Sequence, residues 1–324
     1  GFDHFYGFHH ARSMSSIVVD DTIVQEMDVV EILPAITKAT TDYIDAHAEQ
    51  AKSGKPFFIY FPLSSPHTPI ATAPEWMGKS GIGKYGDFVA QTDGSVGAVM
   101  EALERNGLTE NTIVIFSADN GTSKAGNIPD LEKQGHYPSA NLRGSKADLW
   151  DGGHRVPFIL RWPAQVKAAS TTDQLISLAD MFATFSEMFG YTYADDTAED
   201  SISFAPILLG EELKTPREAV VHHSIDGKFA IRQGPWKLLL APGSGGWSSP
   251  KDAEAKKKGL PDMQLYNMAD DLGEMNNLLE QYPEKVASLI TLLESYVEQG
   301  RSTPGVDQNN DAKIDIWKKG SKNK

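Results

Sequence analysis

Cysteine is absent from this sequence. Its absence excludes disulfide bonds, thiolate metal sites and cysteine nucleophiles from the chain. The sequence also lacks a run of about 18 consecutive apolar residues, which a membrane-spanning helix would need. No signal peptide is visible, but the chain begins with Gly1 inside a patterned segment. We therefore expect an interior cut, and the missing signal says nothing about the compartment.

Positive charge is scarce. The chain has 30 Lys and Arg against 44 Asp and Glu, which gives a formal net charge of −14. A field of this sign repels DNA and RNA, so we expect no nucleic-acid partner. The same field repels other anions. An anionic ligand would therefore need a local concentration of positive side chains.

Common catalytic signatures are also missing. The sequence has no G-x-S-x-G nucleophile elbow. It has no glycine-rich phosphate loop and no dinucleotide-binding fingerprint. These absences exclude the usual serine hydrolase and nucleotide-binding patterns.

Helical and strand patterns alternate along the first part of the chain. Helical spacing of apolar residues covers 33–54, 87–107 and 178–189. Short apolar runs typical of strands cover 57–61, 112–116 and 156–160. The first run has five apolar residues in succession, which is typical of a strand buried on both faces. This order predicts an α/β fold with a mostly parallel sheet flanked by helices.

The pattern changes near residue 192. Short strands with tight turns across 219–240 predict an antiparallel meander. A long Gly/Ser/Lys loop at 241–262 follows, and then a helix from Pro283 to Gly300. The tail 301–324 is polar, and we expect it to be frayed. We therefore predict an α/β domain at 1–210 and a smaller C-terminal domain at 211–324, with an antiparallel sheet and a helix.

Oxygen ligands follow the strand predicted at 112–116. Asp119 and Asn120 supply a carboxylate and an amide oxygen, which are ligands that Ca²⁺ and Mg²⁺ prefer. The same Asp-Asn-Gly sequence is typical of a turn. Two ligands do not complete a site, so both interpretations stay open.

Cationic and histidine side chains lie on nearby loops. Lys146 follows Arg143-Gly144, and its compact ammonium suits a tetrahedral oxyanion. His67, between prolines, and His154 could donate to an anion or act as acids, and each could equally be a structural loop residue. His222 and His223 must face opposite sides of one strand, so at most one faces a site. The residues alone indicate metal-assisted hydrolysis of an anionic ester, with no nucleophile in view.

Several stretches together resemble the type I sulfatases of the alkaline-phosphatase-like superfamily. They are G-F-D-H-F-Y-G at 1–7, P-F-F-I-Y-F at 56–61 with S-P-H-T-P at 65–69, F-S-A-D-N-G at 116–121, L-R-G-S-K at 142–146 and D-G-G-H-R-V-P at 151–157. Q-L-Y-N at 264–267 and E-M-N-N-L at 274–278 resemble the family's C-terminal ending. Bacterial arylsulfatases near the N-acetylgalactosamine-6-sulfatases are the most similar.

The resemblance implies a role for each matching residue. Asp119 and Asn120 would be half of a Ca²⁺ ligand set, with Mg²⁺ the less favoured ion. Lys146 would hold sulfate oxygens, and His67 would bond the ester's leaving oxygen. His154 and His223 would line the substrate. The implied protein is a periplasmic or secreted sulfuric ester hydrolase acting on a sulfated carbohydrate or an aryl sulfate.

The chain departs from the family where the nucleophile belongs. The family's formylglycine is made from Cys or Ser in a C/S-x-P-x-R motif, and no stretch of this chain matches that motif. Asp20 and Asp21 lie downstream of residues 1–7, so they are not the family's first aspartate pair. We therefore expect that the N-terminal third, with the formylglycine and half of the metal site, is missing.

Two other functions stay open at this point. One is hydrolysis of phosphate or phosphonate esters by an enzyme of the same superfamily, because sulfate and phosphate are nearly isosteric. The other is a non-catalytic glycan-binding relative. The sequence does not indicate an oligomeric state.

We expect the purified 324-residue chain to release no sulfate from an aryl sulfate or a sulfated sugar, because it carries no nucleophile motif. Ion chromatography of free sulfate would check this. Turnover above a heat-denatured control would contradict it.

Overall fold

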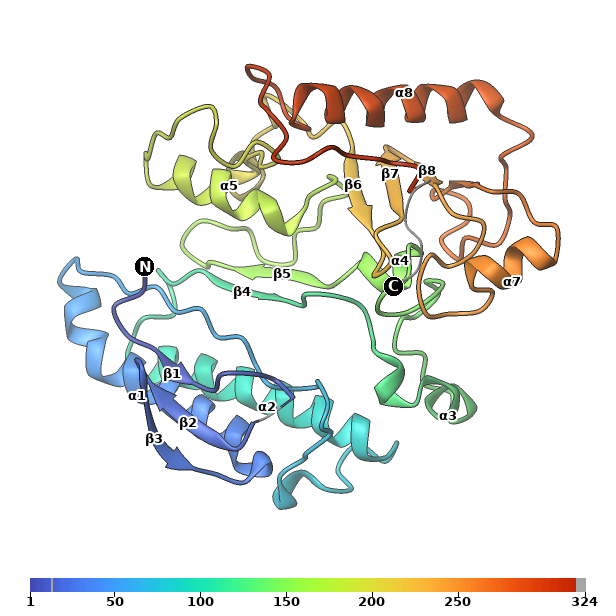
Figure 1. Ribbon diagram of the computed structural model, residues 1–324. Coiled ribbons are helices and arrows are strands. Elements are labelled where there is room, and N and C mark those ends of the chain that lie inside the picture. Colours follow the sequence, from blue (N-terminus) through green and yellow to red (C-terminus); the bar gives the residue numbers. More distant parts are fainter. Residues whose placement is uncertain (13, 319–324) are drawn as a thin grey trace. The chain divides into compact units, whose positions relative to one another are not determined.

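The computed structural model describes residues 1–12 and 14–318, which form two compact units (Figure 1). The first unit comprises Ser123–Pro138, Arg161–Ala164 and the described residues of Gly1–Val114. The second comprises Ile115–Thr122, Ser139–Leu160 and the described residues of Gln165–Lys324. The chain thus passes between the units several times. A domain boundary near residue 211 stays a prediction.

A small antiparallel sheet opens the first unit. It consists of β1 (Tyr6–Gly7), β2 (Ser16–Val19) and β3 (Thr22–Glu26), in that order. Asp20 lies in the turn between β2 and β3 with a φ of 51°. Its carboxylate accepts a hydrogen bond from the Phe5 backbone N–H at 2.9 Å. Asp20 and Asp21 therefore form the turn between these two strands.

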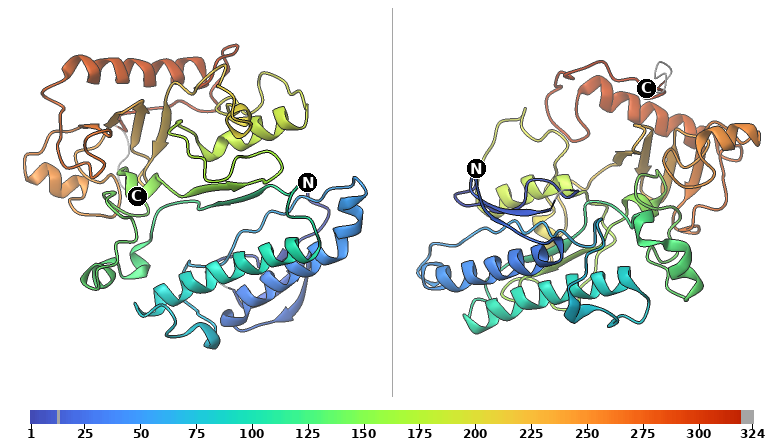
Figure 2. Two further views of the ribbon diagram at one scale, coloured as in Figure 1. Left: turned by 180° about the vertical axis from the view of Figure 1, so that it is seen from behind. Right: turned by 60° about the horizontal axis from the view of Figure 1, so that its bottom comes forward.

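Two long helices pack side by side in this unit, α1 (Val29–Lys52) and α2 (Lys84–Arg105), as the views in Figures 1 and 2 agree. Asp28 caps α1 by accepting from Val30 N at 3.1 Å, which satisfies one of the free N–H groups of the first turn. Ile32 and Leu33 of α1 pack with Phe88 of α2 and with β2. The helices predicted at 33–54 and 87–107 are confirmed, and each begins a few residues earlier.

The apolar run 57–61 is not a strand, so the prediction of a strand buried on both faces is wrong for this structure. Phe57, Ile59 and Phe61 pack against the helices. Phe58 and Tyr60 point the other way and are 66% and 70% exposed. No strand of the described residues pairs with this segment. The apolar run 57–61 is thus extended, and one of its faces is exposed to solvent.

A four-stranded antiparallel sheet forms the centre of the second unit. Its order is β6 (Val220–His223), β7 (Phe229–Gln233), β8 (Trp236–Leu239) and β9 (Gln264–Asn267). Tight turns connect the first three strands, at Asp226-Gly227 and Gly234-Pro235. The predicted antiparallel meander is confirmed.

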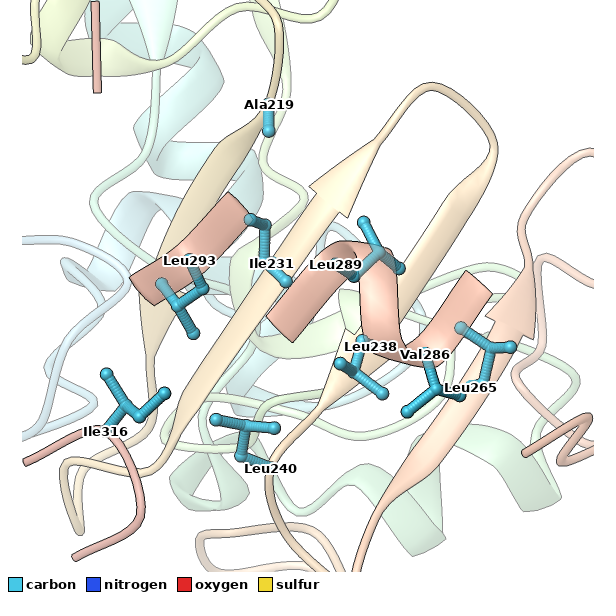
Figure 3. Packing of buried hydrophobic residues seen from close by; sticks show 9 residues of the cluster. All are labelled: Ala219, Ile231, Leu238, Leu240, Leu265, Val286, Leu289, Leu293 and Ile316. Carbon is cyan, nitrogen blue, oxygen red and sulfur yellow. The ribbon is translucent and has the colours of Figure 1, made fainter. Parts of the chain in front are cut away.

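The helix α8 (Pro283–Gln299) packs its apolar stripe against this sheet (Figure 3). The buried cluster consists of Ala219, Ile231, Leu238, Leu240, Leu265, Val286, Leu289, Leu293 and Ile316. Each fully buried leucine stabilises the fold by about 1.5–3 kcal/mol. Gly300 ends the helix with a φ of 66°, a left-handed conformation that favours glycine. The predicted last helix is confirmed.

The remaining elements are short. The strands β4 (Val114–Ser117) and β5 (Phe158–Arg161) form a two-stranded sheet. The other α-helices are α3 (Ile128–Lys133), α4 (Asp151–His154), α5 (Met181–Met188), α6 (Ala205–Leu208) and α7 (Asp252–Lys257). Short 3₁₀-helices lie at Pro74–Trp76, Lys124–Gly126 and Leu178–Asp180.

Two segments differ from their predictions, the loop at 241–262 and the start of the tail. The loop predicted at 241–262 contains α7, and its first six residues are buried. The tail was expected to be frayed from residue 301, but Arg301 is buried and bonds Asp195 at 2.8 Å. Ile316 joins the core. Residues 319–324 of that tail lie outside the described residues.

The α/β class is confirmed, but the three- and four-stranded sheets are antiparallel throughout. Neither sheet is therefore the mostly parallel one expected in 1–210. Across 1–12 and 14–318, no helix combines the length and hydrophobicity needed to cross a membrane.

The uncovered face of 57–61 predicts self-association. Phe2 stacks on Phe58 with ring centroids 5.7 Å apart, and Tyr60 lies exposed on the same segment. Exposed apolar strips of this kind associate in water. We expect Phe58→Ser with Tyr60→Ser to lower the average mass seen by analytical ultracentrifugation at constant concentration. Tyr137→Ser, at another exposed aromatic of this unit, is the matched control. A monomeric unsubstituted chain would contradict this prediction.

Candidate functional site

Backbone hydrogen bonds join two loops of the second unit. Gly121 N donates to Gly153 O at 3.0 Å, and Lys146 N donates to Thr122 O at 2.9 Å. A Cβ on Gly121 would lie 1.8 Å from Gly152 O, so only glycine allows this approach. The segment after β4 and the loop 143–153 therefore form one scaffold. This scaffold carries three of the predicted site residues, Asp119, Asn120 and Lys146.

Asp119 and Asn120 follow β4 closely. The end of this strand is fixed because Ser117 Oγ donates to Pro157 O at 2.8 Å. Asp119 is exposed, and the Asn120 side-chain amide, as assigned, donates to Gly121 O at 3.0 Å. The amide oxygen of Asn120 is thus left to act as a ligand. Two adjacent oxygen donors fit part of a Ca²⁺ site, which takes six to eight.

A complete metal centre is not formed by the described residues. Within 1–12 and 14–318, no group of three His, Cys, Asp or Glu side chains could hold a metal ion. Further ligands for a cation at Asp119 and Asn120 would have to come from elsewhere.

The loop of Lys146 is held rigidly by Asp148, which is fully buried. Asp148 Oδ1 accepts from the N–H groups of Trp247 and Ser248 at 2.8 and 2.9 Å. Its Oδ2 accepts from Ser145 N at 2.8 Å. Hydrogen bonds from three N–H groups satisfy this carboxylate without a cation. Asp148 therefore fixes the backbone on either side of Lys146.

The Lys146 ammonium makes no ion pair within the part of the chain that the structure describes. The residue is half-buried. A fixed, partly desolvated cation without a counter-ion is suited to bind an anionic ligand.

His154, at the end of α4, lies against His222 of β6, with ring centroids 4.1 Å apart. His222 Nε2 hydrogen-bonds Leu149 O at 3.1 Å. His154 Nε2 is buried and has no hydrogen-bond partner among the described residues. Burial, and then the Lys237 ammonium, lower the pKa of His154 to about 4. Burial also lowers the pKa of His222, so both rings are neutral at pH 7.

His223 is turned away from this pair. The residue is exposed, and its Nδ1 lies 2.9 Å from Ser224 O. The alternation argument correctly placed His222 and His223 on opposite faces. The structure brings His222, the histidine that the sequence analysis did not select, beside His154. A substrate-lining role for His223 stays a prediction.

His67 belongs to the first unit, whereas the other predicted site residues belong to the second. Cis peptide bonds precede Pro66 and Pro69 on either side of it. His67 Nδ1 lies 2.6 Å from Thr68 O, to which it donates. Its Nε2 is therefore the ring atom left for a ligand.

A buried ion cluster at the end of the loop 143–151 was not predicted from the sequence. Lys237 is fully buried, and its Nζ lies 2.6 Å from Asp151 Oδ1 and 2.9 Å from Glu274 Oε1. Burial raises the pKa of Glu274. For Asp151 burial is the largest single effect and acts in the same direction, but Lys237, Arg232 and Arg155 together outweigh it and the pKa is lowered. A lysine inside the apolar strand pattern of β8 is the one signal that could have revealed this cluster.

A family model described as Sulfatase matches residues 1–191. N-acetylgalactosamine-6-O-sulfatase of Bacteroides thetaiotaomicron is 34% identical over 271 residues, which are 82% of this chain and 51% of that protein. Arylsulfatase A of Bos taurus is 30% identical over 251 residues, 74% of this chain and 48% of that protein. The chain spans about half the length of the curated relatives it matches.

Solved structures give the same likeness. One from work on glycosaminoglycan metabolism by Bacteroides thetaiotaomicron has a TM-score of 0.71 at 33% identity, covering 83% of this chain and 55% of its own. A sulfatase from Pseudoalteromonas sp. has a TM-score of 0.73 at 20% identity, covering 91% and 59%. The second likeness concerns the fold alone.

The neutral histidines predict that acid destabilises the second unit. Unfolded histidine has a pKa near 6.5, above that of folded His154, so the unfolded state binds more protons below about pH 6.5. The free energy of unfolding should fall by about 2 kcal/mol for His154 alone between pH 7 and 5. Urea unfolding at both pH values would measure this. His154→Gln should flatten the dependence, and the exposed-site control His136→Gln should not. An unchanged slope in His154→Gln would refute the assignment.

Proposed function

This chain belongs to the sulfatase family, and on that premise we propose that it is part of an enzyme that hydrolyses sulfate esters. The observation that carries the proposal is Lys146, whose backbone is fixed on the scaffold that also bears Asp119 and Asn120. Its ammonium makes no ion pair with any residue that the structure describes. Near a net-negative protein surface, such a cation selects for a localised anionic group.

The proposed substrate is a sulfated carbohydrate or an aryl sulfate. Relatives named N-acetylgalactosamine-6-O-sulfatase and arylsulfatase A support this class. Among sugars, a 6-O-sulfated galactose or N-acetylgalactosamine is the favoured choice. The proposed compartment is the periplasm or the exterior of the cell.

The proposed roles follow from the chemistry of each side chain. Lys146 would donate to the sulfate oxygens and stabilise the charge that they carry in the transition state. His67, as an imidazolium with its Nδ1–H bonded to Thr68 O, would give its Nε2 proton to the leaving oxygen and so release the alcohol. His154, neutral at pH 7, would hydrogen-bond a sugar hydroxyl rather than pair with the sulfate, and His223 would line the substrate further out.

The proposed cofactors are Ca²⁺ and formylglycine. Asp119 and Asn120 would hold the cation, which neutralises charge on the sulfate oxygens when it is bound. Formylglycine would come from a C/S-x-P-x-R segment, and no such segment occurs within this chain.

Ligand binding tests the role of Lys146. We expect N-acetylgalactosamine 6-sulfate to bind the chain in isothermal calorimetry, and Lys146→Met to weaken the affinity by roughly 10- to 100-fold, the usual effect of losing a charged hydrogen bond. Lys167→Met, at an exposed lysine of the same unit, is the matched control. Equal affinity of the Lys146→Met variant would refute the proposal. Tighter binding of the 6-phosphate analogue would indicate a phosphate ester hydrolase instead.

A metal titration tests Asp119 and Asn120. We expect Ca²⁺ to shift the Asn120 side-chain amide signal in ¹⁵N nuclear magnetic resonance spectra, and Asp119→Asn to abolish the shift, because a carboxylate is the stronger ligand. Asp173→Asn, at an exposed aspartate of the same unit, should change nothing. A Ca²⁺ shift that persists in Asp119→Asn would place the cation elsewhere.

A further inference from the structure

The loop that carries Lys146 rests on a residue more than a hundred positions downstream. Glu274 Oε2 accepts from Asp151 N, the first N–H of α4, at 2.6 Å. The backbone carbonyl of Glu274 accepts from Arg143 Nη1, also at 2.6 Å. One residue therefore holds both ends of the loop 143–151. We call these two contacts the Glu274 clamp.

Arg143 and Asp151 are themselves locked in place. The Arg143 guanidinium lies 3.7 Å above the centroid of the Trp150 ring, which is almost fully buried. Arg143 O accepts from Gly152 N at 2.7 Å and so closes the loop on itself. Movement at either end would therefore be transmitted to the short segment between them, which contains Lys146.

The backbone of Glu274 has an unusual conformation that suits these two contacts. Its φ of 51° is left-handed, which is uncommon for a residue other than glycine. Asp271 sustains the turn by accepting from Met275 N and Asn276 N, both at 2.8 Å. A backbone held in this conformation directs the carboxylate and the carbonyl of one residue toward two separate partners.

The Lys237 ammonium of β8 balances negative charge on Asp151 and Glu274. Its Nζ lies between Asp151 Oδ1 and Glu274 Oε1, and neither Lys237 nor Glu274 is exposed. Ions buried in this way add little net stability compared with apolar side chains of the same volume. Their hydrogen bonds are directional, however. A buried charged group that loses its partner raises the free energy of the folded state. The cluster is thus better suited to fixing positions than to stabilising the fold.

We propose that Glu274 and Lys237 are positioning residues, which act through Arg143 and Asp151 to set where Lys146 and His154 lie in the ligand site. The part of this inference that concerns a ligand rests on the proposed function. The part that concerns the loop does not. A displacement of about 1 Å in an anion-binding cation is enough to weaken binding and catalysis strongly.

The decisive experiment measures loop order and ligand affinity on the same variants of the full chain. The variants are Glu274→Ala, which removes the side-chain half of the clamp, and Glu274→Gln, which keeps an oxygen acceptor without the charge. Amide hydrogen exchange of Lys146 and Gly152 reports loop order. Calorimetry with N-acetylgalactosamine 6-sulfate reports affinity. Urea unfolding reports stability.

We expect Glu274→Ala to speed exchange at Lys146 and Gly152 at least tenfold and to weaken ligand affinity about tenfold. Leu289→Ala, in the core between α8 and the sheet, should lower stability while leaving both other readouts within twofold of the unsubstituted chain. This control separates loss of position from loss of stability. The same exchange pattern in Leu289→Ala, or unchanged exchange in Glu274→Ala, would overturn the proposal.

A double variant keeps the test decisive if Glu274→Ala fails to fold. Lys237→Met removes the nearest cation from two buried carboxylates and leaves Asp151 with only Arg232 and Arg155, at 3.6 and 3.9 Å. We expect fast exchange and poor stability. Adding Glu274→Gln removes one of those charges and keeps an acceptor for Asp151 N, so exchange at Gly152 should recover at least tenfold. No recovery would overturn the clamp. If the unsubstituted chain binds no sulfated sugar, the proposed function fails, while the exchange data still decide the clamp.

Discussion

A buried ammonium must be matched by carboxylates before the second unit can adopt its structure, and Lys237 imposes that condition. Asp151 opens α4, and Glu274 lies beyond β9. Because both must reach the same Nζ atom, the strand β8, the loop 143–151 and the turn at 271–276 are fixed together. The neutral state of His154 and His222 follows in part from the same charge, since Lys237 comes second to burial in lowering both pKa values.

The scaffold around Lys146 owes its order to the backbone more than to its side chains. Gly121, Gly152 and Gly153 allow two loops to approach more closely than any Cβ would permit. The buried Asp148 carboxylate also holds the loop, because it bonds Ser145 N as well as the N–H groups of Trp247 and Ser248. A lysine on such an ordered backbone loses little conformational entropy when a ligand binds. This loop is therefore suited to binding a small anion.

Local patterns predicted the fold where local physics decides it. The helices α1, α2 and α8 and the meander β6–β8 follow from apolar periodicity, caps and tight turns, and the structure confirms them. The run 57–61 was misjudged because burial of a strand depends on neighbours that the run itself does not encode. The loop predicted at 241–262 contains the short helix α7, which the Gly/Ser/Lys composition did not reveal. Gly246 in this loop allows close packing against Ala147 and Asp148. The family resemblance, read from several motifs at once, is confirmed.

The candidate site was predictable only in part. Asp119, Asn120 and Lys146 stood out because of their motifs, and the structure places them on joined loops. Asp148, Lys237 and Glu274 did not, because their roles depend on contacts that span up to 131 positions of sequence. At Gly121, the absence of a Cβ lets the segment after β4 come close to Gly152. Since a hydrogen bond between peptide groups joins the two loops there, that contact does not depend on which side chain stands at position 154.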